Sequence, residues 1–386
     1  MTRFQVLNAL LHFLAFYIGA GIGSFLNVVI YRLPLGISVN KPRRSFCPSC
    51  KYQIPMWQNI PLLSWVLLRG KCANCGGRIS VRYFLVELLT GVMFYLAFLK
   101  VTAIYPENPW PFLKAWGPEV LCLWIFMSLL ISGTFIDIDH FILPHSITIG
   151  GAVVGVLSAW WVPSLVEQET HTRGLLISLA SAALGLGGLW LVVELGKLAF
   201  GRKKFVFDKE ETWEVTQPDE NEPPVVVFGE HKYDWADLFM RATDRMIVTC
   251  NALQVNERSF GAVTAELWME KLKVREGANL EEFPLEGVTK LTAKTTQVVI
   301  PREAMGFGDV LFLMMIGAFT GWQSVLFTIL AASVLGTVFA VIHRVTGRAE
   351  WGAKIPFGPY LAMGAMLWVF YGPQFFDWYL SKAMWR

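Results

Sequence analysis

The chain has 386 residues, of which 54% are apolar and only 16% are charged, and its formal net charge is +3. Ordinary soluble chains contain about 25% charged residues, so this composition excludes a disordered chain and a plain cytosolic enzyme. Six cysteines in a chain of this length also exclude a disulfide-rich miniprotein. The small net charge gives no indication of a nucleic-acid partner. The apolar residues form long blocks between short polar stretches, which is typical of a membrane protein.

Eight apolar blocks are candidate transmembrane helices, because a helix needs about 20 mostly apolar residues to cross a bilayer. In chain order they are Leu7–Tyr31, Tyr83–Tyr105, Pro118–Ile136, Leu143–Val162, Gly174–Phe200, Ala304–Gly321, Trp322–Ile342 and Ile355–Tyr371. The first block is too long for a signal peptide and has no small-x-small cleavage site, so we expect an uncleaved helix. We find no internal repeats.

Basic residues gather in three of the connecting segments, and short segments of this kind remain in the cytoplasm. They are Arg32, Lys41, Arg43, Arg44, Lys51, Arg69 and Lys71 in the first; Lys197, Arg202, Lys203 and Lys204 in the second; and His343, Arg344, Arg348 and Lys354 in the third. We therefore expect the first loop, the long polar insert and the loop before the last helix to be cytoplasmic, with both termini on the other side.

Two polar regions interrupt the apolar pattern, Leu35–Arg82 and Gly201–Arg302. Within the second region, Val288–Ile300 alternates as a strand does, and Val225–Phe228 suggests another strand. We expect a β-rich soluble insert with a short helix near Trp235–Thr243.

Four cysteines form two Cys-x-x-Cys pairs in the first polar region, Cys47 with Cys50 and Cys72 with Cys75. Two residues between cysteines allow both thiolates to face one cation, and two such pairs complete a tetrahedral Zn²⁺ shell with no position left for water. Two disulfides or four free thiols are the alternatives, but cytoplasmic thiols stay reduced. We expect a zinc-ribbon-like loop with a structural metal. Cys122 and Cys250 have no such partners and should be buried thiols.

Carboxylates within apolar segments are candidate functional residues, because each costs on the order of 2.5–3.5 kcal/mol to insert. Asp137 and Asp139 lie at the end of the third block, and Asp309 lies about six residues into the sixth. Two facing carboxyls share one proton, so that one can activate a water while the other polarises an amide. This is the chemistry of aspartic proteases, and such a pair titrates as a unit.

Alternatives to catalysis exist for each of these carboxylates. A solvated carboxylate is ordinary at the end of a span, and residues at positions i and i+2 of a helix point apart, so at most one of Asp137 and Asp139 joins Asp309. An ion or proton pathway would also need a residue such as Asp309. We consider three hypotheses for this chain: an aspartic endopeptidase, an ion- or proton-coupled transporter, and a non-catalytic membrane scaffold.

Five ordered motifs resemble the type IV prepilin leader peptidase family of Gly-x-Gly-Asp membrane aspartic proteases. They are Gly23–Pro34, the cysteine loop from Ser45 to Tyr83 with Asn59-Ile60-Pro61, the segment from Asp137 to Pro144, Gly306–Asp309 and Pro356–Tyr360. The resemblance covers nearly the whole chain except Gly201–Arg302. His145, Leu311 and Phe84 differ from the residues that the family commonly has at these positions.

The resemblance implies a function for several residues. Asp137, seven residues before Pro144, matches the first catalytic aspartate and Asp309 matches the second, whereas Asp139 matches neither. The family removes the short basic leader from prepilins and pseudopilins on the cytoplasmic side of the inner membrane, after a glycine and before a hydrophobic helix. Many members then methylate the new N-terminus with S-adenosyl-L-methionine, an activity linked to the cysteine region.

These observations together predict an all-α polytopic membrane protein with a small zinc-ribbon-like cytoplasmic loop and a β-rich cytoplasmic insert. The expected domains are the first transmembrane helix (1–34), the zinc loop (35–82), helices two to five with the first aspartate (83–200), the insert (201–302) and helices six to eight with the second aspartate (303–386).

Overall fold

A computed structural model describes most of the chain. The described residues are 3–41, 45–47, 49–103, 113–200, 202–217, 223–239, 244–277, 279–301, 306–346 and 356–383. They form two compact units, one of Met1–Trp190 with Gly306–Arg386 and the other of Leu191–Met305. The expected parts of the sixth and eighth helices before Gly306 and Pro356, the end of the second helix, and residues 240–243 of the short helix lie outside the described residues.

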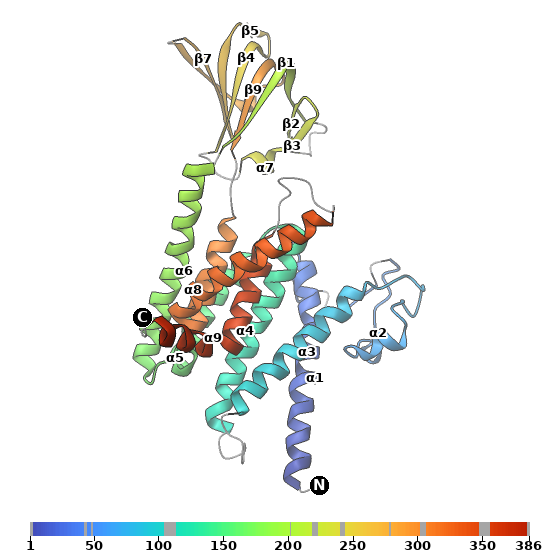
Figure 1. The fold of residues 1–386 in the computed structure, drawn as a ribbon. Coiled ribbons are helices and arrows are strands. Elements are labelled where there is room, and N and C mark those ends of the chain that lie inside the picture. The colour runs from blue at the N-terminus through green and yellow to red at the C-terminus, as the bar shows by residue number, and fades with distance from the viewer. Residues whose placement is uncertain are drawn as a thin grey trace. The chain divides into compact units, whose positions relative to one another are not determined.

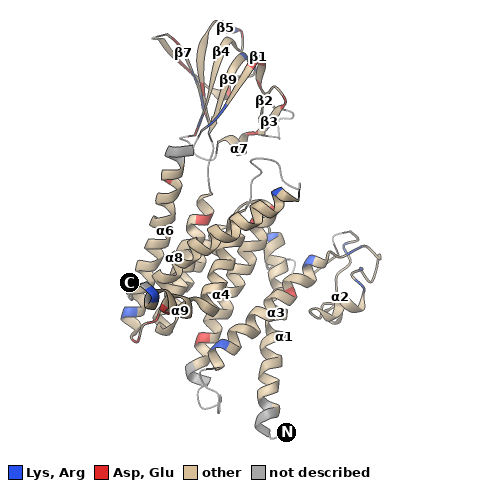
Figure 2. Ribbon diagram, viewed as in Figure 1, with Lys and Arg blue, Asp and Glu red and all other residues tan. Residues whose placement is uncertain are grey.

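Long helices make up most of the first unit (Figure 1). They are α1 (Arg3–Arg32), α3 (Val81–Thr102), α4 (Leu113–His140), α5 (His145–Trp161), α6 (His171–Phe200), α8 (Phe307–Val345) and α9 (Gly358–Ala383). Charged residues are sparse along them (Figure 2). Among the described residues, five stretches are long and apolar enough to cross a membrane: Asn8–Arg32, Val81–Thr102, Trp116–His140, His171–Gly196 and Phe307–Val345. Helix α5 is apolar but shorter.

Element α8 contains the expected sixth and seventh helices, which meet at a kink, so the described residues have a helical segment at each of the eight predicted positions. Gly321 within α8 has φ 85° and ψ 174°, which is not helical. The direction of the chain therefore changes at the predicted boundary, but the helix resumes at Trp322 without a loop. Only glycine adopts such dihedral angles without strain.

Small residues allow the helices of the first unit to pack closely. A Cβ atom at Gly19 of α1 would lie 2.7 Å from Phe94 of α3, and one at Gly155 of α5 would lie 2.8 Å from Phe319 of α8. Between α4 and α8, the rings of Phe126 and Phe319 stack with centroids 4.7 Å apart. Close backbone approach at small residues is the usual packing mode of helices in membranes.

The second unit contains a nine-stranded antiparallel sheet, in agreement with the predicted β-rich insert. The strands are β1 (Arg202–Thr216), β2 (Val225–Phe228), β3 (His231–Asp234), β4 (Arg245–Val255), β5 (Arg258–Phe260), β6 (Val263–Trp268), β7 (Lys271–Glu276), β8 (Asn279–Pro284) and β9 (Leu291–Pro301). Their order is β3-β2-β1-β9-β4-β6-β7-β8, with β5 paired to β4. The described part of the predicted short helix is α7 (Trp235–Leu238).

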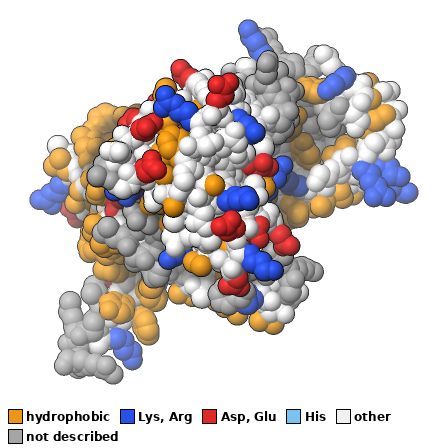
Figure 3. Space-filling view, turned by 90° about the horizontal axis from the view of Figure 1, so that it is seen from above, with side chains coloured by type: hydrophobic (Ala, Val, Ile, Leu, Met, Phe, Trp, Pro, Cys, Tyr) orange, Lys and Arg blue, Asp and Glu red, His pale blue; other side chains and the backbone are white. Residues whose placement is uncertain are grey.

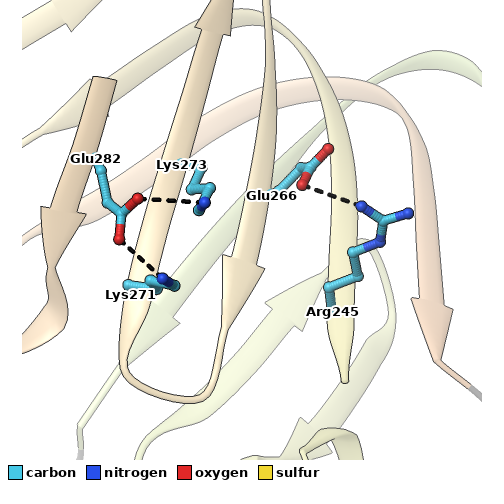
Figure 4. Close-up of polar contacts among 5 residues, drawn as sticks. All are labelled: Arg245, Glu266, Lys271, Lys273 and Glu282. Carbon is cyan, nitrogen blue, oxygen red and sulfur yellow. Dashed lines mark hydrogen bonds and ion pairs between the residues drawn. The ribbon is translucent and has the colours of Figure 1, made fainter. Parts of the chain in front are cut away.

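Alternation along the strands gives this sheet an apolar side and a polar side. Strand β6 alternates buried and half-buried residues, and fully buried Trp213, Phe228 and Met246 form part of its core. On the polar side, Glu282 of β8 pairs with Lys271 and Lys273 of β7 at 2.9 and 3.2 Å, and Arg245 pairs with Glu266 at 3.3 Å (Figure 4). In the view from above in Figure 3, acidic and basic side chains are interspersed on the surface. These features are those of a water-exposed sheet surface.

Candidate active site

Asp137 lies in the last turn of α4 and is 5% exposed. The backbone N–H of Gly358, the first residue of α9, donates a hydrogen bond of 3.0 Å to its Oδ2 atom. Helix α4 continues to His140 rather than ending at Ile136 as predicted, so Asp137 is helical and its side chain is directed inward. A buried carboxylate needs such a donor, because burial removes the water that would otherwise solvate its charge.

Asp309 lies in the first turn of α8 and is 7% exposed. The helix begins at Phe307, so Asp309 is closer to the start of its helix than the sequence indicated. Gly306 precedes the helix in extended conformation, and its carbonyl accepts a hydrogen bond of 3.2 Å from the Asp309 N–H. A carboxylate in the first turn is favoured by the partial positive charge at a helix N-terminus.

The fold brings these two aspartates to one end of the first unit, although 172 residues separate them in the sequence. Leu143 lies close to a glycine beside each aspartate. A Cβ atom at Gly308 would lie 3.0 Å from the Cβ of Leu143, and one at Gly358 would lie 3.4 Å from its Cδ1. The site therefore combines two buried carboxyls with Leu143, whose side chain lies close to both Gly308 and Gly358.

Asp139 has a different environment from Asp137. Its Oδ2 atom forms an ion pair of 2.5 Å with Nη1 of Arg82 in the first turn of α3. Its side chain is 28% exposed. The i and i+2 positions thus point apart as expected, and the carboxylate of Asp139 already has a cationic partner.

The four cysteines of the first polar region gather in one cluster. Their sulfur atoms all lie within 4.8 Å of one another, with Cys47 3.9 Å from Cys75 and Cys50 4.0 Å from Cys72. All four are free thiols rather than disulfides. Zn–S bonds of about 2.3 Å in a tetrahedron place sulfurs about 3.8 Å apart, so this donor set fits zinc.

Two similar turns position these sulfurs. In the first, the N–H of Cys47 donates to the Tyr52 carbonyl at 2.9 Å, and in the second the N–H of Cys72 donates to the Gly77 carbonyl at 2.8 Å. Gly76 has φ 69°, a conformation that glycine adopts without strain. Each turn is closed by an isolated β-bridge, Phe46 with Gln53 and Lys71 with Arg78.

The environments of the sulfurs differ. Backbone hydrogen bonding from Cys50, with smaller contributions that include Ser49, lowers the pKa of the Cys47 thiol to about 6. At Cys75, the hydrogen bond from the backbone N–H of Gly77 lowers the pKa of the thiol. The neighbouring sulfurs and burial raise it, and the resulting pKa of Cys75 is about 11.

The remaining cysteines, Cys122 and Cys250, are each 1% exposed and free, as predicted.

Glu87 is a buried carboxylate that the sequence analysis did not single out. It lies in α3, is 9% exposed, and its Oε2 atom accepts a hydrogen bond of 2.7 Å from the N–H of Leu62 in the cysteine loop. Beside it, Asn27 of α1 donates to the Tyr83 carbonyl at 3.1 Å. The first contact attaches the loop to α3, and the second joins α1 to α3. The cost of a carboxylate within an apolar block would have indicated Glu87 from the sequence, as it did Asp309.

The three positions that depart from the resemblance are accommodated. Phe84 packs against Trp65 of the loop helix α2 (Leu63–Leu67), with ring centroids 5.3 Å apart. Leu311 is buried in α8, and His145 is the exposed first residue of α5. None of these side chains replaces either aspartate or any of the four cysteines.

Two family models match the chain. The bacterial peptidase A24 N-terminal domain matches residues 17–101, and the type IV leader peptidase family matches residues 124–206 and 259–341. The first range contains all four cysteines of the cluster. The second family model contains Asp137 in its first range and Asp309 in its second.

Curated proteins that match the chain in sequence have names that resemble one another. A type 4 prepilin-like proteins leader peptide-processing enzyme of Escherichia coli is 36% identical over 225 residues, covering 50% of this chain and 78% of that protein. A prepilin leader peptidase/N-methyltransferase of Stutzerimonas stutzeri is 28% identical over 394 residues, covering 96% and 93%. A protein of the same name from Myxococcus xanthus is 43% identical over 145 residues, covering 38% and 39%.

No solved structure matches the chain. The evidence for kinship therefore comes from the sequence matches, which extend over both aspartates and the cysteine cluster. On this evidence the chain belongs to the type IV leader peptidase family.

Proposed function

We propose that this protein is a membrane aspartic endopeptidase that cleaves the basic leader from type IV prepilins or pseudopilins and N-methylates the new N-terminus. The observation that carries the proposal is that Asp137 and Asp309 are both buried and that Leu143 lies close to the glycine beside each of them, Gly358 and Gly308. The family matches and the names of the relatives support both activities.

The proposed catalytic pair works by sharing one proton. The ionised carboxyl accepts a proton from a water molecule as that water attacks the scissile amide, while the protonated carboxyl donates a hydrogen bond to the amide oxygen. Proton transfer to the leaving nitrogen then completes the cleavage. The hydrogen bond from Gly358 holds the carboxyl of Asp137 in place, and we assign the role of base to this residue.

The position of the pair suits a substrate that spans the membrane. The aspartates lie at the end of the unit where α1 ends and α3 begins, which is also the end that carries the cysteine loop. We propose that this end faces the cytoplasm, because basic residues gather in its connecting segments. A prepilin with a basic leader keeps that leader on the same side, so its hydrophobic helix can lie beside the enzyme while the scissile bond reaches the pair.

Cys47, Cys50, Cys72 and Cys75 are the proposed zinc ligands. Bound zinc would cross-link the two turns. It would have no open coordination position for water or substrate, since four sulfurs fill a tetrahedral shell. S-adenosyl-L-methionine would supply the methyl group for the new N-terminus, and we assign this activity to the region of the cysteine loop. The bacterial inner membrane is the proposed location.

The transporter alternative is not supported by the comparisons. Transporter sites tend to lie near the middle of the bilayer between structural repeats. Here both aspartates lie in the terminal turns of their helices, and the sequence has no repeat. The position of the carboxyls therefore favours a site that meets water and substrate at an interface.

The proposal is tested by co-expressing a prepilin with the isosteric variants Asp137→Asn and Asp309→Asn. Mass analysis of the product reports both leader removal and methylation. Each variant should lose cleavage by about 100- to 10,000-fold, because each removes one partner in proton transfer. Asp377→Asn, an exposed carboxylate of α9, is the matched control and should cleave normally. Full cleavage by Asp309→Asn would refute the assignment, and an unmethylated product at saturating methyl donor would refute the second activity.

A further inference from the structure

Arg82 contacts the end of α4 on both sides of Asp137. Its Nη2 donates a hydrogen bond of 3.2 Å to the carbonyl of Phe135, and its Nη1 pairs with Asp139 at 2.5 Å. The guanidinium carbon also lies 5.2 Å from the centroid of the Phe135 ring. One side chain from α3 thus holds the residues two before and two after Asp137.

We propose that Arg82 is a positioning residue for the carboxyl of Asp137. This inference rests on the proposed function, since it assumes that Asp137 acts on the substrate. Arg82 itself does not contact Asp137 in any hydrogen bond or ion pair of the described structure, so its action passes through the backbone of α4.

The chemistry of this helix end explains why a cation is needed there. The last turn of a helix carries a partial negative charge, and α4 adds the carboxyls of Asp137 and Asp139 to it. A cation from α3 offsets this repulsion. The side chains of Arg82 and Asp139 are 33% and 28% exposed, so their pair is partly shielded from water.

The shape of the guanidinium explains why the residue is arginine. Its rigid fork serves two different acceptors at once, a carboxylate and a backbone carbonyl, while its plane lies over the Phe135 ring. A lysine ammonium is a single point charge on a flexible stem and cannot hold all three partners in one geometry. Lysine should therefore restore the charge but only part of the positioning.

Arg82 is itself positioned by the cysteine loop. The Oγ atom of Ser80, the N-cap of α3, accepts a hydrogen bond of 3.3 Å from the Arg82 backbone N–H. The preceding carbonyl, that of Ile79, accepts a hydrogen bond of 3.3 Å from the indole of Trp65. The folded loop is therefore connected to the proposed catalytic carboxyl through Arg82.

The experiment measures kcat and KM for prepilin cleavage in Arg82→Gln, Arg82→Lys, Asp139→Asn and the double variant Arg82→Gln/Asp139→Asn. A displacement of about 1 Å at a reacting group costs about 100-fold in rate, so Arg82→Gln should lower kcat by about 10- to 100-fold. KM should remain within about twofold of the parent, because substrate binding does not involve this residue. Arg82→Lys should recover part of kcat.

The remaining variants test whether the contacts act together. Asp139→Asn should lower kcat by a smaller factor, since the contacts of Arg82 with Phe135 remain. The double variant should be no slower than Arg82→Gln alone, because both changes remove the same ion pair. Arg173→Gln, an exposed arginine in the first turn of α6, is the matched control and should keep the parental kcat. Zinc content should be unchanged in every variant.

Several outcomes would overturn the inference. Parental kcat in Arg82→Gln would do so, as would a raised KM with unchanged kcat, which would make Arg82 a substrate-binding residue. If Arg82→Gln does not accumulate in membranes, the isosteric Asp139→Asn decides, and parental kcat in that variant counts against the inference. Asp137→Asn run in parallel separates the two proposals: cleavage by that variant refutes the function, whereas its inactivity beside a fully active Arg82→Gln refutes only the positioning role.

Discussion

The backbone N–H of Gly358 donates a hydrogen bond of 3.0 Å to Oδ2 of Asp137, joining the first residue of α9 to the last turn of α4. These two residues are 221 positions apart in the chain. The approach is possible because residue 358 has no side chain. A Cβ atom there would lie 2.6 Å from the same Oδ2 atom, which is closer than real Cβ contacts allow.

Gly358→Ala should therefore greatly reduce cleavage. The new methyl group displaces either the Asp137 carboxyl or the start of α9, and we expect kcat to fall by about 100-fold, as for a displacement of about 1 Å. Gly150→Ala is the matched control, because a Cβ atom at that helical glycine of α5 would meet nothing within 4 Å. Prepilin cleavage by both purified variants gives the comparison. Equal rates would mean that the carboxyl tolerates displacement.

Replacement of a single cluster cysteine should release the metal. Cys72→Ser exchanges a thiolate for a weaker ligand, and a structural site that loses one of four ligands loses much of the free energy that folds its loop. Metal analysis of the purified protein should find about one zinc per chain in the parent and far less in the variant. The control is Cys250→Ala in the second unit, which should keep the parental zinc content. Zinc retained at full stoichiometry by Cys72→Ser would exclude a four-cysteine site.

Removal of the β-sheet unit should leave the aspartate site in place. The first residue of β1, Arg202, pairs with the last residue of β9, Pro301. The chain therefore enters and leaves the sheet at points only about 5 Å apart. The core of the sheet, which includes Trp213 and Met246, consists of its own residues. A short Gly/Ser linker can therefore replace 202–301.

The shortened protein should retain its zinc and cleave prepilin within a few-fold of the parental rate. The measurement is the cleavage assay with metal analysis on the same preparation. A well-folded, zinc-loaded protein that no longer cleaves would assign the sheet a required part in substrate processing, contrary to this expectation.

Lys100 of α3 compensates for a missing hydrogen bond in α9. Pro373 has no N–H, so the carbonyl of Val369 four residues earlier lacks its helical donor, and the ammonium of Lys100 donates to that carbonyl. Lys100→Met should lower the thermal stability of the detergent-solubilised protein. We expect a loss of about 1.5–3 kcal/mol, the usual contribution of a hydrogen bond to a charged group.

A second substitution tests the cause of that loss. Pro373→Ala restores an N–H at position 373, so Lys100→Met should cost less in this background, and the difference between the two costs is the coupling. Thermal unfolding followed by circular dichroism gives all four values. Equal costs in both backgrounds would show that Lys100 stabilises the protein by another route.

The sequence by itself determined several features. Apolar blocks of about 20 residues must be helical where they cross a bilayer, since no water is present there to satisfy backbone groups. Their positions were predicted within a few residues at most ends, and Gly321 marked the break within α8. The spacing of Cys47, Cys50, Cys72 and Cys75 predicted their cluster, because Cys-x-x-Cys geometry is local and two such turns suit one metal. The alternation in Val288–Ile300 and the apolar run Val225–Phe228 likewise indicated strands of the insert.

Only the tertiary structure decided which groups support these residues. Asp137 and Asp139 are chemically identical and two positions apart, yet one accepts a hydrogen bond from Gly358 and the other pairs with Arg82. Nothing in local periodicity distinguishes these environments, because each partner comes from a distant segment of the chain. Hydrogen bonds and ion pairs act over about 3 Å, and which donors come within that range of a buried carboxyl depends on how the helices pack.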